Sequence, residues 1–385
     1  MPKRKKREQN KSLRIAMFGQ KHTFSHEGGI ETVVTELICR MADKGYAVTC
    51  FDRSGRTGMD ERKILQKKDS RIRIKHVLTV NSRGFAALTS SLSASICTAF
   101  GNYDIVHVHA EGPAAACWLP KLFGKRVICT IHGLDWQREK WGRFASLYIK
   151  QGERIAAKYA DEVIVLNEST RQYFLREYGR ETVVIPNGVT EPKKSAANLI
   201  REYWNLEQDS YVLFVGRLVP EKGLRYLLEA WKEIQTEKKL VIAGGTPASE
   251  HFLQELKELA SENVFFTGFV QGAALDELYS NAYLYVLPSD LEGMPLSLME
   301  AMSFGMCCLT SDIPGCMETA EDRAFYFEHG NVEALRKSIQ SLLDTPETVK
   351  NCKAKASEFI LEKYSWDKTV DMTLAVYLNH WEEMT

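Results

Sequence analysis

The sequence has no long apolar run, no net charge and no cluster of metal-binding residues. Its hydrophobic stretches fall short of the roughly 18 residues that a membrane-spanning helix needs, so any membrane contact would be peripheral. Fifty basic residues balance 50 acidic ones, which gives no reason to expect a nucleic-acid partner. The nine cysteines are scattered, without a C-x-x-C pair or a His/Cys cluster, as is typical of reduced cytosolic proteins. We therefore expect no structural metal.

The chain begins with a basic arm. Pro2–Lys11 reads PKRKKREQNK with no apolar run behind it, which does not fit a secretory signal. Such an arm is either a solvated, disordered start or a segment attracted to anionic lipid headgroups. We expect a cytoplasmic protein with a disordered arm over residues 1–12. A peripheral contact of Lys3–Lys11 with an anionic membrane, at its inner face, is the alternative.

Short β-branched strands alternate with helical stretches along the rest of the chain. The first strand is followed by a helical pattern over Gly29–Lys44, which Gly45 ends. The polar, turn-forming stretch Asn187–Asn198 interrupts the alternation, which then restarts. Near-continuous apolar strands indicate parallel sheets that are buried on both faces. The predicted strands are Leu13–Gly19, Ala47–Phe51, Ile74–Leu78, Asp104–His109, Arg126–Ile131, Glu162–Leu166, Val183–Ile185, Tyr211–Val215, Lys239–Ala243, Val264–Phe266, Leu284–Pro288 and Met306–Leu309.

This pattern predicts an α/β protein with two Rossmann-like, doubly wound parallel-sheet domains. A length of 385 residues is too great for one ordinary core. The predicted ranges are 13–190 for an amino-terminal domain, 191–365 for a carboxyl-terminal domain and 366–385 for a helix that packs back on the first domain. We expect the two domains to face across a cleft, with ligands at the carboxyl ends of the strands.

Two glycines open the first predicted helix. Gly28 and Gly29 would let the backbone approach a ligand closely, and the helix amino terminus would present free N–H groups to a phosphate. The alternative is a simple turn into a helix. The sequence has no G-x-G-x-x-G motif, which argues against a dinucleotide-binding fold.

Histidines lie near the ends of two predicted strands. His107 and His109 alternate on a buried strand and are interpreted mainly as structural, with His109 also a weak candidate for binding an acceptor. His132 differs because Gly133 follows it at a strand end, where side chains face a ligand site. We expect His132 to hydrogen-bond a substrate hydroxyl or to stabilise developing charge.

Two cations follow the strand Tyr211–Val215. Arg217 and Lys222 lie five residues apart on either side of a strand-to-helix turn. They can hold one diphosphate, the arginine as a fork and the lysine as a point charge. The alternative is a solvated charged loop.

The most specific motif is LPSDLEGMPLSLMEAM over Leu287–Met302. Pro295 suits the first turn of a helix, so the backbone amides of that turn are expected to bind an anion. Glu292 precedes the helix and Glu300 lies within it, a separation that suits one elongated ligand. One carboxylate would accept sugar hydroxyls and the other ribose hydroxyls; capping or ion pairing is the alternative. The residues assigned to this turn are Gly293, Met294, Pro295 and Leu296.

Together these motifs resemble family four of the retaining glycosyltransferases, which have the GT-B fold. The resemblance extends from Leu13 to Trp366. EGMPLSLMEAM, GRLVPEKG, PNGV at Pro186–Val189 and GGIE in the first loop occur in the family's order and spacing.

The resemblance implies a role for each matching residue. Arg217 and Lys222 would bind the donor diphosphate, and Glu292 the transferred sugar. Glu300 would bind the nucleotide ribose, and His132 the sugar. The resemblance also implies transfer from a nucleotide-diphosphate sugar with retention of anomeric configuration. It further implies that no metal or other cofactor is needed, because cations and the helix dipole neutralise the leaving diphosphate.

The stretch HGLDWQREKWGRF over His132–Phe144 is similar to bacterial rhamnosyltransferases of capsule and exopolysaccharide assembly, whose acceptor is a lipid-linked saccharide. Trp136 and Trp141 could stack on acceptor sugars, with core packing or a lid as alternatives. If the donor carries deoxyribose, Glu300 loses one of its two hydroxyl partners.

Two other functions fit the same fold. A nucleotide-sugar epimerase would need an acid/base set, which the sequence does not show. An inactive nucleotide-sugar-binding scaffold would have a damaged motif set, yet all five matching residues are present. We therefore predict transfer of a hexose or deoxyhexose, with rhamnose as a candidate, to a saccharide acceptor, expected to be lipid-linked, in cell-surface polysaccharide biosynthesis.

Overall fold

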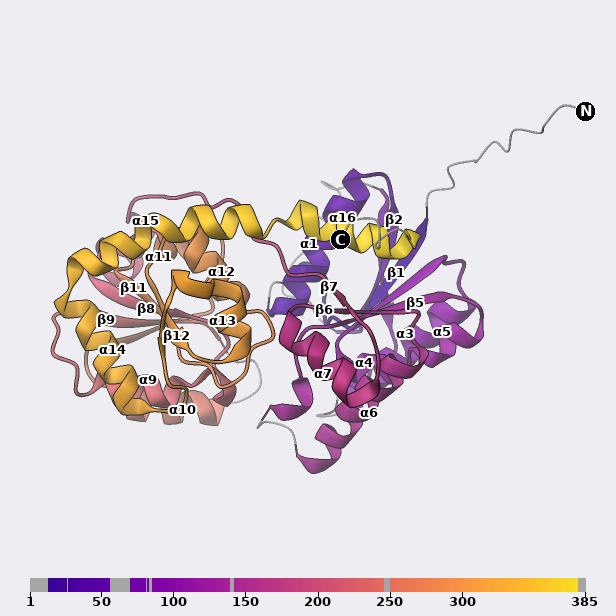
Figure 1. Ribbon diagram of the computed structural model, residues 1–385, viewed down its shortest axis with the longest axis horizontal. Coiled ribbons are helices and arrows are strands. Elements are labelled where there is room, and N and C mark those ends of the chain that lie inside the picture. The colour runs from indigo at the N-terminus through magenta and orange to yellow at the C-terminus, as the bar shows by residue number, and fades with distance from the viewer. Residues whose placement is uncertain are drawn as a thin grey trace, which may run out of the picture. The chain divides into compact units, whose positions relative to one another are not determined.

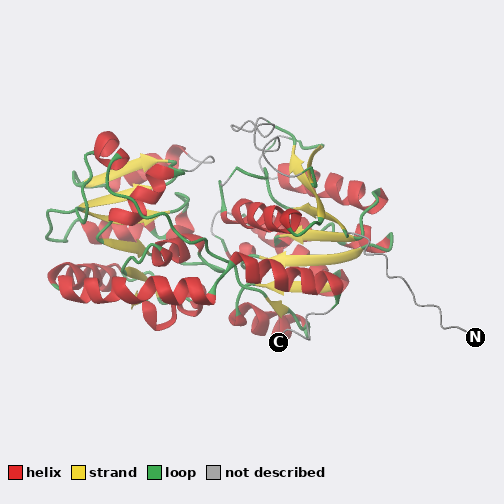
Figure 2. Cartoon of the chain, turned by 90° about the horizontal axis from the view of Figure 1, so that it is seen from above, coloured by secondary structure: helices red, strands yellow, loops and turns green. Residues whose placement is uncertain are grey.

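The computed structural model describes residues 13–25, 27–55, 70–80, 82, 85–138, 142–245 and 250–379 (Figure 1). Its helices lie on both faces of two sheets (Figure 2). The basic arm Lys3–Lys11 and Trp141 lie outside the described residues. Internal contacts divide the chain into two compact units. Unit 1 comprises the described residues of Met1–Ile131, Tyr148–Ile164 and Thr373–Thr385, and unit 2 those of His132–Leu147 and Val165–Met372.

The first sheet has seven strands in the order β3-β2-β1-β4-β5-β6-β7. The pairs from β3 to β5 run parallel. All five residues of β4 are buried, as expected for a strand covered on both faces. The strands are β1 Arg14–Phe18, β2 Ala47–Arg53, β3 Ile72–Val77, β4 Ile105–His109, β5 Arg126–Ile131, β6 Glu162–Val165 and β7 Val183–Val184.

The second sheet has six strands in the order β10-β9-β8-β11-β12-β13, and all its neighbours run parallel. The strands are β8 Tyr211–Val215, β9 Lys239–Ala243, β10 Val264–Gly268, β11 Leu284–Leu287, β12 Cys308–Ser311 and β13 Phe325–Phe327. The prediction of two Rossmann-like parallel-sheet domains is therefore confirmed.

Both sheets have a point where the strand order reverses. In the first sheet, β1 lies between β2 and β4; in the second, β8 lies between β9 and β11. Loops that leave the carboxyl ends of the strands on either side of such a point diverge and leave room for a ligand. In the second sheet, the topology therefore predicts a ligand site at the loops after β8 and β11.

Helices connect the strands. They are α1 Gly29–Asp43, α3 Phe85–Phe100, α4 Glu111–Ala114, α5 Trp118–Leu122, α6 Arg143–Tyr159, α7 Glu168–Tyr178, α8 Leu199–Trp204, α9 Leu224–Trp231, α10 Glu250–Leu259, α11 Ala273–Asn281, α12 Leu296–Ser303, α13 Pro314–Ala320, α14 Val332–Asp344, α15 Pro346–Lys363 and α16 Trp366–Leu378. Two of them carry asparagine caps that satisfy an amide of the first turn: Asn167 accepts from Thr170 N, and Asn331 from Ala334 N.

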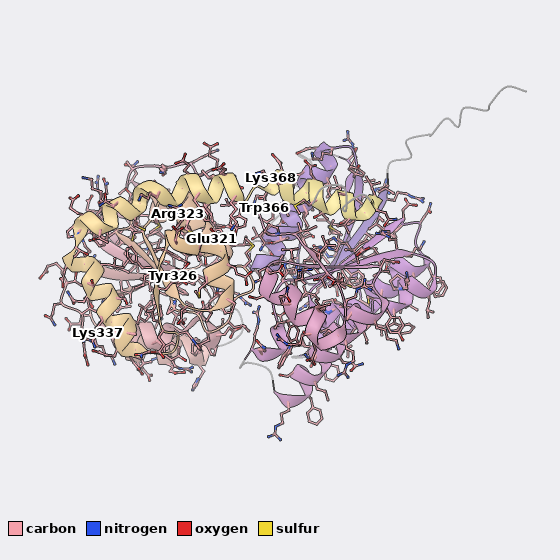
Figure 3. The ribbon with its side chains drawn as sticks, in the orientation of Figure 1. Glu321, Arg323, Tyr326, Lys337, Trp366 and Lys368 are labelled. Atoms are coloured by element: carbon pink, nitrogen blue, oxygen red, sulfur yellow. The ribbon has the colours of Figure 1, made fainter. Side chains whose placement is uncertain are left out.

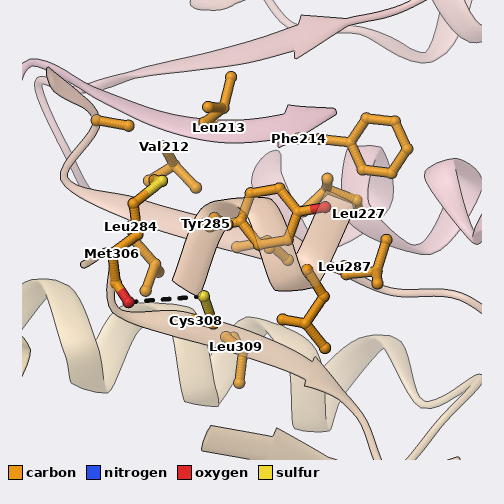
Figure 4. Packing of buried hydrophobic residues seen from close by; sticks show 14 of the residues in the cluster. Val212, Leu213, Phe214, Leu227, Leu284, Tyr285, Leu287, Met306, Cys308 and Leu309 are labelled. Atoms are coloured by element: carbon orange, nitrogen blue, oxygen red, sulfur yellow. Dashed lines mark hydrogen bonds between the residues drawn. The ribbon is translucent and has the colours of Figure 1, made fainter. Parts of the chain in front are cut away.

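The core of unit 2 lies around β8, β11 and β12 (Figure 4). Leu213, Tyr285 and Leu309 come from these three neighbouring strands, and all are fully buried. Tyr285 keeps its hydroxyl satisfied by donating to Ser297 Oγ at 2.9 Å. This packing fixes the strands whose ends carry the candidate site.

Two details of the second sheet differ from the sequence-based prediction. The strand expected over Met306–Leu309 instead runs from Cys308 to Ser311. Met306 N donates to Ala301 O and so closes the end of α12, which removes it from the sheet. The three-residue strand β13 was not predicted because it is too short for a periodic signal.

Specific contacts hold α15, α16 and the 3-10 turn Glu321–Arg323 in place. The Arg323 guanidinium lies 5.7 Å from the ring of Phe359 on α15. Tyr326 OH donates to Glu321 O at 2.5 Å, and Figure 3 shows Glu321, Arg323 and Tyr326 near one another. In unit 1, the end of α16 contacts the first sheet, where Arg126 Nη2 donates to Val376 O at 3.0 Å. No helix in the described part of the chain is long and apolar enough to cross a membrane.

Candidate active site

An ion pair joins the loops that follow β8 and β11. Lys222 Nζ lies 2.5 Å from Glu292 Oε1, and the two side chains are only 12% and 11% exposed. Ser289 Oγ, which is fully buried, donates to the same carboxylate oxygen at 2.7 Å. Charge-assisted contacts of this kind are among the stronger hydrogen bonds in proteins. The structure therefore brings together two residues predicted for the site and orients the Glu292 carboxylate.

Backbone packing holds the same two loops together. Gly223 has φ +67°, and a Cβ there would lie 1.8 Å from Pro288 O. Asp290 N donates to Glu221 O at 3.0 Å. Only glycine fits a left-handed position with so close a neighbour. The position of Lys222 relative to Glu292 is thus set by main-chain contacts on both sides of the pair.

The turn after Glu292 is enclosed by other segments of unit 2. A Cβ on Gly293 would lie 2.0 Å from His132 O, and one on Gly315 would lie 2.2 Å from Glu292 O. Asn167 Nδ2 donates to Gly293 O at 2.6 Å. These approaches leave no room for a side chain at Gly293. They also place the backbone of the predicted residue His132 against the predicted donor turn.

The first turn of α12 provides backbone donors beside this carboxylate. Leu298 N and Met299 N donate to Pro295 O, so Pro295 lies just before the helix and not within its first turn as predicted. The amides of Leu296 and Ser297 are therefore beyond the reach of an intrahelical acceptor and carry the positive end of the helix dipole. Met294 is buried, and its sulfur accepts from Asn187 N at 3.2 Å.

Glu300 lies one turn into the same helix. Its Oε2 accepts from Tyr279 OH at 3.0 Å. Burial, and next the nearby Glu300 carboxylate, raise the pKa of Tyr279 well above its usual value, so this phenol remains a donor. Tyr279 thereby orients Glu300. Glu300 lies in α12, whose first turn comes shortly after Glu292 in the sequence.

Arg217 is the second predicted cation of the site. Burial first, and then the positive charge of Arg138, lower the pKa of Arg217. Within the described part of the chain, its guanidinium forms no ion pair. A half-buried arginine that is close to another cation favours binding an anion such as a diphosphate.

Arg138 is a site residue that sequence reasoning missed. Its guanidinium lies 2.7 Å from Asp135 Oδ1 and 3.5 Å from Glu221 Oε1. Glu221 is buried, so Arg138 compensates a carboxylate withdrawn from water. The signal in the sequence was the Asp135/Arg138 pair three residues apart, just after His132. Ser289 and Asn167 were also missed. Ser289 lies only three residues before Glu292, but its residue type alone does not indicate the contact, whereas Asn167 contacts Gly293 from 126 residues away.

His132 is neutral at physiological pH. Burial lowers its pKa from 6.5 to about 4, nearby Asp135 opposes the shift, and Arg138 adds to it. A neutral imidazole can donate and accept hydrogen bonds but supplies no positive charge. Trp136 lies partly buried in the 3-10 turn Asp135–Gln137 that follows.

The remaining predicted residues belong to unit 1. Gly28 precedes α1, and a Cβ there would lie 2.7 Å from Glu31 Oε2. Glu31 Oε1 accepts from Lys21 N at 2.9 Å, so a carboxylate of the protein already lies at this helix start. Gly29 is the first residue of the helix.

His109 is fully buried, and its ring lies 4.1 Å from that of His107. His107 in turn contacts Tyr377 OH and Thr130 Oγ1, each at 2.6 Å. These contacts favour the structural interpretation of both histidines over acceptor binding by His109. Among the described residues, no group of three or more His, Cys, Asp or Glu could hold a metal ion.

Both halves of the chain match family models of known proteins. The family model Glycosyltransferase Family 4 matches residues 27–191, and Glycosyl transferases group 1 matches residues 197–359. An uncharacterized glycosyltransferase of Methanocaldococcus jannaschii is 26% identical over 304 residues, which are 71% of this chain and 75% of that protein. The UDP-Gal:alpha-D-GlcNAc-diphosphoundecaprenol alpha-1,3-galactosyltransferase of Escherichia coli is 27% identical over 303 residues, 72% of this chain and 76% of that protein.

A solved structure has the same fold. The Anabaena protein Alr3699/HepE, crystallised with UDP-glucose, superposes with a TM-score of 0.78 at 16% identity and covers 95% of this chain and 99% of that one. The two family matches and the two parallel sheets identify the chain as a glycosyltransferase of the GT-B fold, with a family 4 amino-terminal part and a group 1 carboxyl-terminal part.

Proposed function

We propose that this enzyme transfers a hexose or deoxyhexose from a nucleotide-diphosphate sugar to a saccharide acceptor, with retention of anomeric configuration and without a metal ion. The observation that carries the proposal is the grouping, within unit 2, of the Lys222–Glu292 pair, the half-buried Arg217 and the first turn of α12. Two cations and a helix amino terminus suit a diphosphate, while an oriented carboxylate suits sugar hydroxyls.

Each residue then has a defined role in donor binding. Arg217 and Lys222 hold the diphosphate, together with the amides of the turn that begins at Gly293. Glu292 accepts hydroxyls of the sugar, and Glu300, oriented by Tyr279, accepts ribose hydroxyls. When the diphosphate binds, its oxygens share the Lys222 ammonium with Glu292.

In the reaction, the bond between the anomeric carbon and the diphosphate oxygen breaks, and a bond to the acceptor oxygen forms on the same face of the sugar. The acceptor proton passes to an oxygen of the departing diphosphate, so the products are the nucleoside diphosphate and the glycoside. Arg217, Lys222 and the helix dipole stabilise the negative charge on the leaving group. His132, being neutral, donates a hydrogen bond to the sugar and leaves the balance of charge unchanged.

The comparisons support the substrate classes. The name of the Escherichia coli relative states a UDP-sugar donor and a diphosphoundecaprenol-linked saccharide acceptor. The Anabaena structure contains UDP-glucose. We propose a lipid-linked saccharide acceptor and a role in cell-surface polysaccharide assembly, at the cytoplasmic face of a membrane. Rhamnose on dTDP remains a candidate donor on the strength of the His132–Phe144 stretch.

A thermal-shift panel tests this proposal. The purified protein is heated in EDTA with UDP, GDP, ADP or dTDP and with their sugar conjugates. Because only the folded state binds, the matching diphosphate raises the melting temperature by mass action. A selective shift without metal supports the donor site and identifies the base, with dTDP pointing to rhamnose. A shift that appears only with added Mg²⁺ contradicts metal independence.

Two outcomes would favour other functions. Conversion of the nucleotide sugar to an epimer without acceptor would indicate an epimerase. Binding without any turnover, in the presence of saccharide acceptors, would indicate a nucleotide-sugar-binding scaffold.

A further inference from the structure

Helix α3 (Phe85–Phe100) carries an exposed apolar face in unit 1. Five of its apolar side chains are exposed, with exposed fractions from 37% at Leu88 to 71% at Phe100; they are Phe85, Leu88, Leu92, Ile96 and Phe100. At about 100° per residue, these positions fall within an arc of about 120° on the helix. None of the 16 residues of the helix is charged. An exposed apolar stripe without interspersed charge is unusual for a soluble surface, where exposed apolar residues are scattered singly.

Helix α5 (Trp118–Leu122) extends this face. The rings of Phe100 and Phe123 have centroids 4.5 Å apart, and α3 and α5 lie side by side (Figure 1). Leu122 is 72% exposed and Phe123 is 48% exposed. We call the exposed apolar side chains of α3, α5 and Phe123 the α3–α5 surface. This surface extends from one helix to the next, so it differs from apolar residues that are exposed singly.

Basic groups border the Phe100 end of the α3–α5 surface. Lys125 Nζ donates to Gly101 O at 2.7 Å, immediately after α3. Lys75 Nζ donates to Tyr103 OH at 3.2 Å. The acidic residue at this end, Asp104, forms a bidentate contact with Arg14, at 3.0 Å from Nε and 2.8 Å from Nη2. Lys75 and Lys125 therefore supply positive charge at this border.

The described chain also starts at this border. Arg14 is the second described residue, and it is held to Asp104, four residues after Phe100. The 12 residues that precede Leu13 contain six lysines and arginines and one glutamate. The sequence therefore joins an excess of positive charge to the chain just before Leu13.

We propose that the α3–α5 surface docks on an anionic lipid bilayer. The apolar side chains enter the boundary between headgroups and acyl chains, while the basic border contacts anionic headgroups. The basic residues that precede Leu13 in the sequence add to this attraction. A second copy of the chain is the competing occupant. An isologous dimer would bury the apolar side chains but would leave the adjacent positive charge without a complementary partner. The combination of apolar face and positive border favours lipid.

Co-sedimentation with vesicles tests the proposal. The full chain is mixed with vesicles of phosphatidylcholine alone, or of phosphatidylcholine and phosphatidylglycerol in equal parts. We expect binding to the anionic vesicles that weakens as salt is added. A full-length Phe100→Glu/Leu122→Glu variant should bind at least about tenfold more weakly, because it places charge in the apolar face. Changing Lys3, Arg4, Lys5, Lys6 and Arg7 to Ser should reduce the preference for anionic over neutral vesicles.

A matched control separates this surface from general exposure. Tyr203 in unit 2 is 56% exposed, and Tyr203→Glu should leave vesicle binding unchanged. An unchanged melting temperature confirms that the Phe100→Glu/Leu122→Glu variant is folded. The proposal is overturned if the wild-type chain binds neither vesicle, or if the charged variant binds as well as wild type. It is also overturned if sedimentation shows a dimer that this variant dissociates while vesicles are not bound. The readout requires no donor, so it is independent of the proposed transfer.

Discussion

Lys222 and Glu292 form an ion pair at 2.5 Å between loops that leave neighbouring strands of one parallel sheet. The cation assigned to the donor diphosphate thus orients the carboxylate assigned to the donor sugar. Ser289 holds the same carboxylate oxygen from the other side. Such preorganisation means that little rearrangement is needed when charge develops on the leaving group.

Glu292→Ala should abolish transfer without weakening diphosphate binding. The change removes the acceptor for sugar hydroxyls, which should lower turnover at least about a hundredfold. It also leaves the Lys222 ammonium free for the diphosphate. Turnover with the matching nucleotide sugar and calorimetry with its diphosphate measure the two effects. Glu255→Ala is the control, since Glu255 also pairs with a cation, Arg225, but lies on α10. Full turnover by Glu292→Ala would show that the sugar site is elsewhere.

Arg217→Ala should weaken binding of the free nucleoside diphosphate as well as slow transfer. Loss of a charge-assisted contact to a phosphate typically costs about 1.5–3 kcal/mol, which corresponds to roughly a tenfold to hundredfold rise in Kd. Isothermal titration calorimetry of wild type, Arg217→Ala and the surface control Arg225→Ala measures this change. Equal affinity in all three proteins would exclude Arg217 from the diphosphate site.

The sequence predicts the fold well because its information is local. Apolar strands such as Tyr211–Val215 and the glycines that follow some of them, such as Gly19 and Gly216, carry clear signals. The structure places a strand at each predicted position, with ends shifted by a few residues. The prediction of Met306 as a strand residue was wrong. Its amide donates to Ala301 O at the end of α12, which the periodicity of the sequence does not show.

The candidate site was predicted only in part. Arg217, Lys222, Glu292 and Glu300 belong to short motifs, so their types and spacing could be recognised. Other residues of the candidate site, Ser289, Tyr279 and Arg138, could not be recognised in this way. Their contacts form only in the folded chain. Burial, which makes His132 neutral, is equally invisible in one sequence.

Glu300→Gln should discriminate between parts of the donor. We expect about tenfold weaker binding of a ribonucleoside diphosphate and little change for inorganic pyrophosphate, because a charged acceptor of ribose hydroxyls is lost. Calorimetry with both ligands checks this. Tyr279→Phe should have the same sign but a smaller effect, since it removes only the orienting hydroxyl. Equal losses for both ligands would indicate a general distortion of α12.

Stability should fall on acidification because of His132. Its pKa is about 4 in the folded protein and 6.5 in the unfolded chain, so between these values the unfolded chain binds more protons. The free energy of unfolding should therefore decrease as pH drops from 6.5 towards 4, with His132 contributing up to about 3 kcal/mol. Urea denaturation at several pH values measures this slope. His132→Asn should reduce it; an identical slope in this variant would contradict the lowered pKa of His132.

Gly223→Ala should destabilise unit 2 more than Gly179→Ala. Both glycines have positive φ, +67° and +60°, but a Cβ at Gly223 would meet Pro288 O at 1.8 Å, while nothing lies within 4 Å at Gly179. We expect losses of about 3 kcal/mol or more and about 1 kcal/mol respectively. Denaturant midpoints compare them. Equal losses would mean that the loops after β8 and β11 can separate.

The most direct test is transfer itself. The wild-type protein and Glu292→Ala are incubated in EDTA with a radiolabelled nucleotide sugar, chosen by the thermal-shift panel, and with lipid-linked saccharides extracted from membranes. The account predicts that label enters the lipid fraction with an unchanged anomeric configuration, and that Glu292→Ala gives none. Binding of the donor without transfer to any saccharide, or equal transfer by both proteins, would contradict it.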